Sequence, residues 1–133
     1  MDTFISVLLL GLMLLSLAYI ATFWFRAMRS FDDLIKYEYE NLHEQWIAEG
    51  EPRGMFWKPP QRSNNILNLL VRSNPGLKIL KWTFFAPQWV KSNADAESTL
   101  KRARKYMLCW NIAVPLWFSL FFGLIYLYAL ISK

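Results

Sequence analysis

Two long runs without a charged side chain, one near each end of the chain, constrain the fold more than any other feature. They cover residues 3–25 and 106–132. At about 1.5 Å per residue, a helix over either run can cross a hydrocarbon core of about 30 Å. Because backbone groups inside a bilayer must bond within their own segment, each run is predicted to be a transmembrane helix. The sequence therefore predicts an all-α membrane protein whose two transmembrane helices form an antiparallel hairpin.

The first run is expected to remain as an anchor and not to be removed as a signal peptide. A signal peptide has a positive start, a shorter apolar core and a cleavage site of small residues. This chain has Asp2 near its start, and its first run ends in Phe23-Trp24-Phe25, followed by Arg26. These bulky residues stand where a cleavage site requires small ones.

Nearly all of the charge lies between the two runs, and the chain has a formal net charge of +5. Lys and Arg accumulate where residues 26–105 meet the runs, as they do on the cytoplasmic flanks of membrane helices. Residues 26–105 are therefore predicted to form a mostly helical cytoplasmic segment, basic and rich in aromatic residues, and both termini are predicted to be extracytoplasmic. The flanking cations are Arg26, Arg29, Lys36, Lys91, Lys101, Arg102, Arg104 and Lys105.

The first part of this segment has the pattern of an amphipathic helix over residues 30–49. Ser30 is a reasonable N-cap, but the helix can also continue from the first run with a bend near Arg29 or Ser30; Gly50 is a stop signal. Residues 54–60 end in two prolines and are predicted to be extended. They pack on their own segment or bind a partner, and the sequence leaves both alternatives open. The apolar stripe of the helix consists of Phe31, Ile35, Tyr39, Leu42 and Trp46.

Residues 77–90 are apolar, aromatic and basic, but they are too short to cross a membrane. Such a segment lies along the membrane surface or packs in a small soluble core, and we expect the former.

A short helix is predicted before it, over residues 66–71, and another begins after it at Ser92 or Asn93. The basic cluster at 101–105 sets the orientation or attracts anionic headgroups, and no nucleic-acid motif accompanies it. The residues expected at the membrane interface are Trp24, Lys78, Lys81, Trp82, Phe84, Phe85, Trp89, Lys101, Arg102, Arg104 and Lys105.

Small residues occur at matching depths in the two runs. Counted from the inner end of each run, Ser16 and Pro115 both lie about 14 Å deep at 1.5 Å per residue. Gly11 and Gly123 lie about 21 Å and about 25 Å deep on the same scale. Because small residues let helix backbones approach in a membrane, these four residues are predicted to be the packing positions of the hairpin.

Side chains suited to catalysis or metal binding are scarce. Glu40 and His43 have the Glu-x-x-His spacing found in di-iron helical bundles. The chain has a single histidine, so only an oligomer could complete such a site. The single cysteine, Cys109, excludes an internal disulfide framework. We therefore expect no cofactor and no enzymatic activity, and we keep a metal-binding oligomer as the alternative.

The second half of the chain resembles the universal stress protein B family, which consists of small two-span bacterial membrane proteins. The resemblance rests on the aromatic stretch Leu80-Lys-Trp82-Thr-Phe-Phe-Ala-Pro-Gln-Trp89 and on Leu100-Lys-Arg-Ala-Arg-Lys-Tyr106 before the last run. Residues 30–60 have no clear counterpart. The resemblance implies a protein of the bacterial inner membrane that is linked to stress tolerance and has no defined activity.

Taken with the topology, these features predict a non-enzymatic interaction partner, subunit or modulator of a membrane complex. Its expected partners are the lipid bilayer, with anionic lipids as a candidate, and another membrane protein or a second copy of the chain. Nucleic acid is not expected. The alternative is a membrane-bound enzyme or metal-binding oligomer that uses Glu40 and His43.

Overall fold

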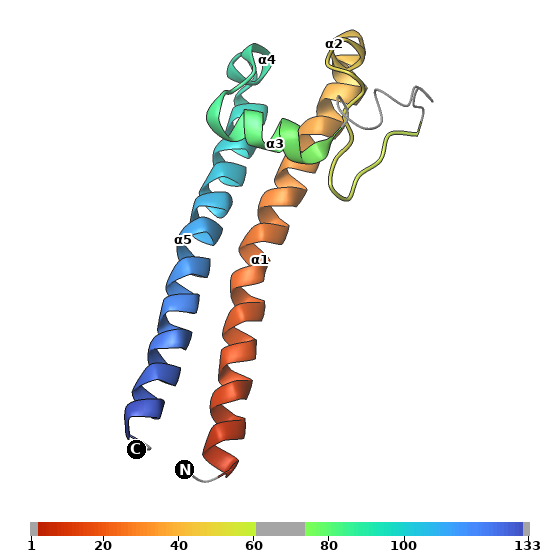
Figure 1. The fold of residues 1–133 in the computed structure, drawn as a ribbon. Helices are drawn as coiled ribbons and strands as arrows, with labels where there is room; N and C mark the ends of the chain where they lie inside the picture. Colours follow the sequence, from red (N-terminus) through yellow and green to blue (C-terminus); the bar gives the residue numbers. More distant parts are fainter. Residues whose placement is uncertain (1–2, 61–73, 132–133) are drawn as a thin grey trace. The chain divides into compact units, whose positions relative to one another are not determined.

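The computed structural model describes residues 3–60 and 74–131. Every regular element in these ranges is a helix, which confirms the all-α prediction. The predicted helix over residues 66–71 lies outside the described residues. Figure 1 labels the helices α1 (Thr3–Asn41), α2 (His43–Ala48), α3 (Pro75–Phe84), α4 (Gln88–Lys91) and α5 (Ala94–Ile131).

Two of these helices, α1 and α5, are long and apolar enough to cross a membrane. The candidate spans lie within Ser6–Asn41 and Ala94–Leu130, and none of the residues in their most apolar windows is buried inside the protein. Apolar helices that expose their side chains all round are typical of membrane-spanning segments. Pro115 lies inside α5, a position that membrane helices tolerate because neighbouring groups can bond the freed carbonyl.

The chain divides into two compact units. The apolar unit consists of Met1–Phe25 with Tyr106–Lys133, and the central unit consists of Arg26–Lys105. The division falls at the inner ends of the two uncharged runs. Both α1 and α5 therefore contribute one part to each unit.

No new helix begins at Ser30, so of the two alternatives the helix that continues from the first run is the one observed. α1 continues through this position, and the Ser30 hydroxyl donates a hydrogen bond to the Arg26 carbonyl one turn earlier. No glycine or proline interrupts the chain here, so the helix has no reason to stop. The predicted stop is confirmed, because Gly50 follows α2 with a φ of 90°, a left-handed conformation that glycine adopts without strain.

Asparagine side chains begin α3 and α5. The side-chain Oδ1 of Asn74 accepts a hydrogen bond from the Gly76 N–H at 2.9 Å, and Pro75 occupies the first helical position. Asn93 accepts from the N–H groups of Asp95 and Ala96 at 3.0 and 3.1 Å. The predicted start of a helix at Ser92 or Asn93 is thus confirmed, since these bonds satisfy donors that the first turn leaves free.

The central unit has its own core, in which α3 lies between α1 and α5 (Figure 1). Large side chains from all five helices are buried there. The stripe predicted for residues 30–49 contributes three fully buried members, whereas Tyr39 and Leu42 are half-buried. The largest buried apolar side chains are Met28, Phe31, Leu34, Ile35, Trp46, Ile79, Trp82, Trp89, Val90 and Leu100.

Candidate functional site

A cluster of three charged residues joins α1 and α3 to Glu49, which directly follows α2. The Lys78 ammonium donates hydrogen bonds to a carboxylate oxygen of Glu38 and to one of Glu49, the latter at 2.8 Å. The side chains of Lys78 and Glu38 are almost completely buried, and that of Glu49 is partly exposed. The ammonium also lies 4.5 Å from the centre of the Trp82 ring, where the ring face attracts a cation. We call Glu38, Lys78 and Glu49 the ion triad.

The two carboxylates of the ion triad have opposite pKa shifts. Burial raises the pKa of Glu38, and the charge of Lys78 offsets this effect in part. Burial also acts to raise the pKa of Glu49, but the hydrogen bond and charge of Lys78 outweigh it and lower the pKa. Oε1 of Glu38 is buried with no hydrogen-bond partner among the described residues. Because two carboxylates share one ammonium, Glu38 is the member of the triad that gains a proton first.

A second buried carboxylate, that of Asp32 on α1, holds the extended segment that follows α2. It accepts hydrogen bonds from the backbone N–H groups of Met55, Phe56 and Trp57 at 2.6, 2.7 and 2.9 Å. A Cβ atom at Gly54 would overlap a carboxylate oxygen of Asp32, so the segment can approach this closely only with glycine there. Of the two alternatives for residues 54–60, these contacts favour packing on the same segment.

Aromatic side chains complete the interior of the central unit. Tyr37 stacks on Trp89 at 5.6 Å, and its hydroxyl accepts a hydrogen bond from the Asn93 amide at 2.7 Å. Trp46 donates from its indole N–H to the Pro52 carbonyl at 2.8 Å. These bonds give the Tyr37 hydroxyl and the Trp46 indole N–H a partner, whereas the buried Trp89 indole N–H has none among the described residues. The stack joins α1 to α4, and the Trp46 bond joins α2 to the segment after it.

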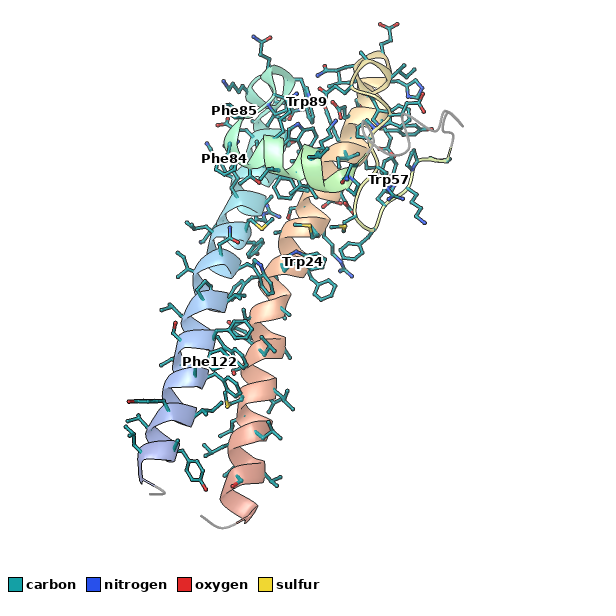
Figure 2. All side chains as sticks on the ribbon, in the orientation of Figure 1. Trp24, Trp57, Phe84, Phe85, Trp89 and Phe122 are labelled. Carbon is teal, nitrogen blue, oxygen red and sulfur yellow. The ribbon has the colours of Figure 1, made fainter. Side chains whose placement is uncertain are left out.

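The segment 77–90 contributes to the core and to the surface at once, which corrects part of the interface prediction. Trp82 and Trp89 were expected in the membrane surface and Lys78 near headgroups, but all three are buried in the central unit. The physical reason is that carboxylates and rings from α1 and α2 supply the partners that the bilayer was expected to supply. Lys81, Phe84 and Phe85 are exposed, and Figure 2 shows the two phenylalanines on the outside of this unit.

The predicted interface cations have different surroundings. Arg104 is half-buried, and its guanidinium donates from Nε and Nη2 to the Trp82 carbonyl at 3.0 and 2.6 Å. Lys101 pairs with Glu97 one turn earlier, whereas Arg102 and Lys105 are exposed. Arg104 therefore has an internal role that the sequence did not indicate. In the apolar unit, the half-buried Trp24 packs its ring edge-on against Phe25 and stays a predicted interface residue.

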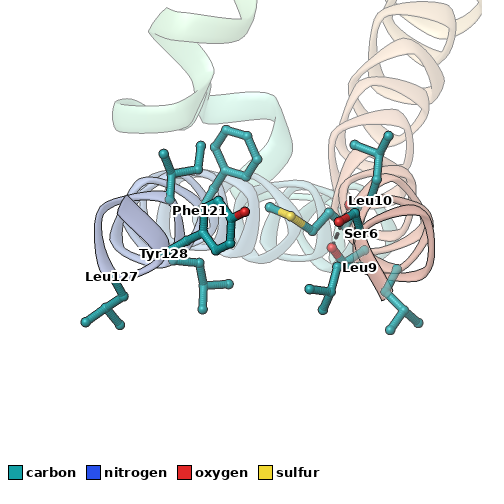
Figure 3. A pocket seen from close by; sticks show the side chains of 11 residues that line it. Ser6, Leu9, Leu10, Phe121, Leu127 and Tyr128 are labelled. Carbon is teal, nitrogen blue, oxygen red and sulfur yellow. Dashed lines mark hydrogen bonds between the residues drawn. The ribbon is translucent and has the colours of Figure 1, made fainter. Parts of the chain in front are cut away.

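A groove lies within the apolar unit, between residues of α1 and residues of α5 (Figure 3). Its volume is about 710 Å³, and leucine, isoleucine, methionine and phenylalanine side chains make up most of its wall. Beside it, the Trp117 indole N–H donates to the Ser16 hydroxyl at 2.8 Å, and Trp117 stacks on Phe121 at 5.5 Å. We call this space the lateral groove. It is lined by Ser6, Leu9, Leu10, Leu12, Met13, Ser16, Phe121, Leu124, Ile125, Leu127 and Tyr128.

The packing positions predicted for the hairpin are only partly brought together. Ser16 bonds to Trp117, but the glycines do not pack as expected, since nothing lies within 4 Å of a Cβ atom built at Gly11 or Gly123. A contact between the two segments is instead made by the large Trp117 side chain, which reaches the Ser16 hydroxyl. Pro115 is exposed, and the Ser16 hydroxyl donates to the Met13 carbonyl within its own helix.

Glu40 and His43 do not form a metal site with other described residues. Glu40 pairs with Lys36 at 3.7 Å. The His43 ring stacks on Trp46, and its Nδ1 lies 3.2 Å from the Tyr39 carbonyl oxygen. In residues 3–60 and 74–131, no group of three or more His, Cys, Asp or Glu side chains is arranged to hold a metal ion.

Comparisons with known proteins give no match. No family model matches the chain, no curated protein matches it, and no solved structure matches it. The resemblance to the universal stress protein B family therefore stays a prediction, and any functional argument must come from the site residues themselves.

Proposed function

We propose that this chain is a non-catalytic two-span protein of the bacterial inner membrane that acts as a partner, subunit or modulator of a membrane complex. The observation that carries the proposal is the lateral groove. It is a concave, almost wholly apolar surface formed by two helices whose composition suits a bilayer. Its volume of about 710 Å³ falls in the range of about 300–1,000 Å³ that is common for binding pockets.

The occupant that we propose for the groove is an apolar helix of another membrane protein. An apolar hollow gains dispersion contacts only when another surface fills it. Helices in membranes associate through close packing and not through the hydrophobic effect, so a preformed hollow is the feature that distinguishes one partner from bulk lipid. The Ser16–Trp117 hydrogen bond and the Trp117–Phe121 stack stabilise the shape of this surface. A lipid chain in the groove is the competing outcome.

The membrane topology that accompanies this function is an antiparallel hairpin with both termini extracytoplasmic and residues 26–105 in the cytoplasm. Its support is the placement of Lys and Arg at the inner ends of both runs. Reporter fusions after Lys133 and within the turn at Gly50 test it. A reporter at Gly50 that is active only outside the cytoplasm contradicts this topology.

Affinity purification in mild detergent tests the role of the groove, provided that groove variants and matched controls are compared. Leu9→Trp and Leu124→Trp fill the groove from α1 and from α5. Leu15→Trp and Leu120→Trp make the same change at residues outside it, both of which are 69% exposed. We expect a protein that co-purifies with the wild type and with the controls to be lost from the groove variants.

Equal recovery of the same proteins with all four variants would show that the groove does not select a partner. Retention of lipid alone, displaced by the groove variants and not by the controls, would assign the groove to a lipid chain. The Glu40 and His43 geometry gives no observation in favour of the enzymatic alternative, so no second function is proposed.

A further inference from the structure

The α3 helix has two apolar faces, and only one of them is used inside the central unit. Ile79 and Trp82 point into the core beside Lys78. Leu77, Leu80 and Phe84 recur at spacings of three and four and so lie on one stripe of the helix. Together with Phe85, which follows the helix, they are 55%, 57%, 70% and 73% exposed in chain order. We call these four residues the α3 outer face.

This much exposed apolar surface in one place marks an interaction site in a folded protein. The alternatives for the occupant are a membrane surface and a protein. The choice between them follows from the basic residues of α3 and α5 and from the hydrogen bonds that join α3 to Arg104.

The position of α3 along α5 is set by the Arg104 hydrogen bonds to the Trp82 carbonyl. Arg104 lies two residues before Tyr106, the first residue of the uncharged run, which corresponds to about 3 Å along a helix. The last turn of α3 is thus bonded to the point on α5 where charged sequence gives way to apolar sequence. In a chain whose second run spans a bilayer, that point is the membrane surface.

The charges near the α3 outer face are complementary to an anionic surface. α3 contains no acidic residue, and its exposed Lys81 lies one turn after Leu77. On α5, Arg102 and Lys105 are exposed near Arg104. A helix that combines large apolar residues with lysine is typical of segments that bury one face in the headgroup and acyl boundary. Each basic residue near an anionic leaflet contributes about 1 kcal/mol of attraction.

We propose that the α3 outer face inserts into the anionic surface of the bilayer that holds the two spans, with Phe84 and Phe85 deepest and Lys81 at the headgroups. The inference rests on the membrane setting of the proposed function. This proposal differs from the prediction that residues 77–90 as a whole lie along the membrane surface, because Trp82, Trp89 and Lys78 stay in the protein core. In this position the α3 outer face holds the central unit on the membrane surface.

The test uses the full-length chain with Cys109→Ser, so that one introduced cysteine carries an environment-sensitive dye. Phe84→Cys probes the α3 outer face, and Leu80→Cys is a second probe on the same stripe. Ile47→Cys, on α2, is the matched control, because Ile47 is an exposed apolar residue of the same unit. Leu120→Cys probes the second run. Each protein is reconstituted at low protein-to-lipid ratio into vesicles of phosphatidylcholine and phosphatidylglycerol that contain brominated lipid.

We expect quenching at Phe84 and Leu80 to be about twofold or more stronger than at Ile47, because an inserted apolar face lies about 5–10 Å into the boundary between headgroups and acyl chains. Lys81→Gln should weaken the quenching at Phe84 in anionic vesicles and leave it unchanged in vesicles of phosphatidylcholine alone. Quenching at Leu120 with none at Phe84 or Leu80 overturns the proposal and leaves the membrane setting intact. An absence of quenching at Leu120 as well overturns the proposed function. A face reserved for a protein partner would leave Phe84 and Leu80 unquenched in these vesicles, and so would also overturn the proposal.

Discussion

Arg104 donates two hydrogen bonds to the backbone carbonyl oxygen of Trp82, from Nε at 3.0 Å and from Nη2 at 2.6 Å. Trp82 lies in the last turn of α3, where carbonyl groups have no partner within the helix. A cation at this end also complements the negative end of the helix dipole. The Arg104 side chain therefore caps the C-terminal end of α3 and joins this helix to α5.

Arg104→Gln should loosen the end of α3. The variant replaces two charge-assisted hydrogen bonds with at most a weaker neutral one, and bonds to charged groups contribute about 1.5–3 kcal/mol each. We expect backbone amides of α3 to exchange hydrogen faster, by a factor equivalent to about 1–3 kcal/mol. Hydrogen exchange followed by mass spectrometry measures this, and Arg102→Gln, at an exposed neighbour, is the control. Equal exchange in both variants would show that the Arg104 contact does not hold the helix.

Lys78→Met should destabilise the central unit strongly. It leaves Glu38 and Glu49 without their shared cation, and removal of one partner from a buried ion pair costs about 3–5 kcal/mol. The double variant Lys78→Met with Glu38→Leu should recover most of this loss, because an apolar pair of similar size replaces the buried charges. Denaturant unfolding followed by tryptophan fluorescence measures both, with Lys81→Met as the exposed control. A double variant less stable than Lys78→Met alone would contradict this view of the ion triad.

Glu38→Gln should change how stability depends on pH. Because burial raises the pKa of Glu38, the folded protein holds this proton more tightly than the unfolded chain does. The contribution of Glu38 to the free energy of unfolding of the wild type is therefore lost as the pH rises from the ordinary carboxyl pKa through the raised one. The variant lacks this loss, so its free energy of unfolding relative to the wild type should increase with pH across that window. Unfolding curves at several pH values check this, and a difference that falls with rising pH would contradict the raised pKa.

The Glu49 carboxyl should behave in the opposite way. The pKa of Glu49 is lowered in the folded protein. Its contribution to the free energy of unfolding is therefore present above the ordinary carboxyl pKa and is lost as the pH falls through the lowered value. Glu49→Gln should therefore lose stability relative to the wild type at neutral pH and approach it in acid. The same unfolding series measures this, and a Glu49→Gln penalty that persists in acid would show that the loss is not electrostatic.

Asp32→Ala and Gly54→Ala should affect the same contact. The first removes the acceptor of three backbone N–H groups, and the second forces the Asp32 carboxylate away from them. We expect each to cost about 1–3 kcal/mol, the range for leaving a hydrogen-bonding group without its partner. The double variant should cost little more than either single one. Additive losses in the unfolding free energy would show that the two residues act independently.

Much of the helical framework could be predicted from the sequence because the signals are local. Gly50 and Asn93 end or begin helices through bonds and backbone conformations that involve only neighbouring residues. The uncharged runs and the stripe that begins at Phe31 follow from composition and periodicity alone. At Ser30 the local signals left two alternatives, a helix cap or a continuing helix, and the second is observed because no glycine or proline interrupts the chain there.

The ion triad could not be predicted because its members meet only through the fold. Lys78 bonds to Glu38 and Glu49 from a separate helix, and the two apolar faces of α3 give no indication of which one is buried. One signal was available, since Glu38 lies seven residues after Phe31 and so falls on the predicted apolar stripe. A carboxylate on such a stripe needs a buried cation, and Lys78 supplies it. Nothing in the sequence around Asp32 indicates its three backbone partners.

The close approach of Asp32 and Gly54 has a consequence for how this sequence can vary. The carboxylate occupies the space that any side chain at position 54 would need. Positions 32 and 54 lie on different segments of the chain, but the side chain at one limits which side chain fits at the other. Neither position has an unusual local sequence pattern. In sequences that descend from a common ancestor with this one, position 54 should be free to change only where the carboxylate at position 32 has been lost, so that the two positions are inherited as a pair.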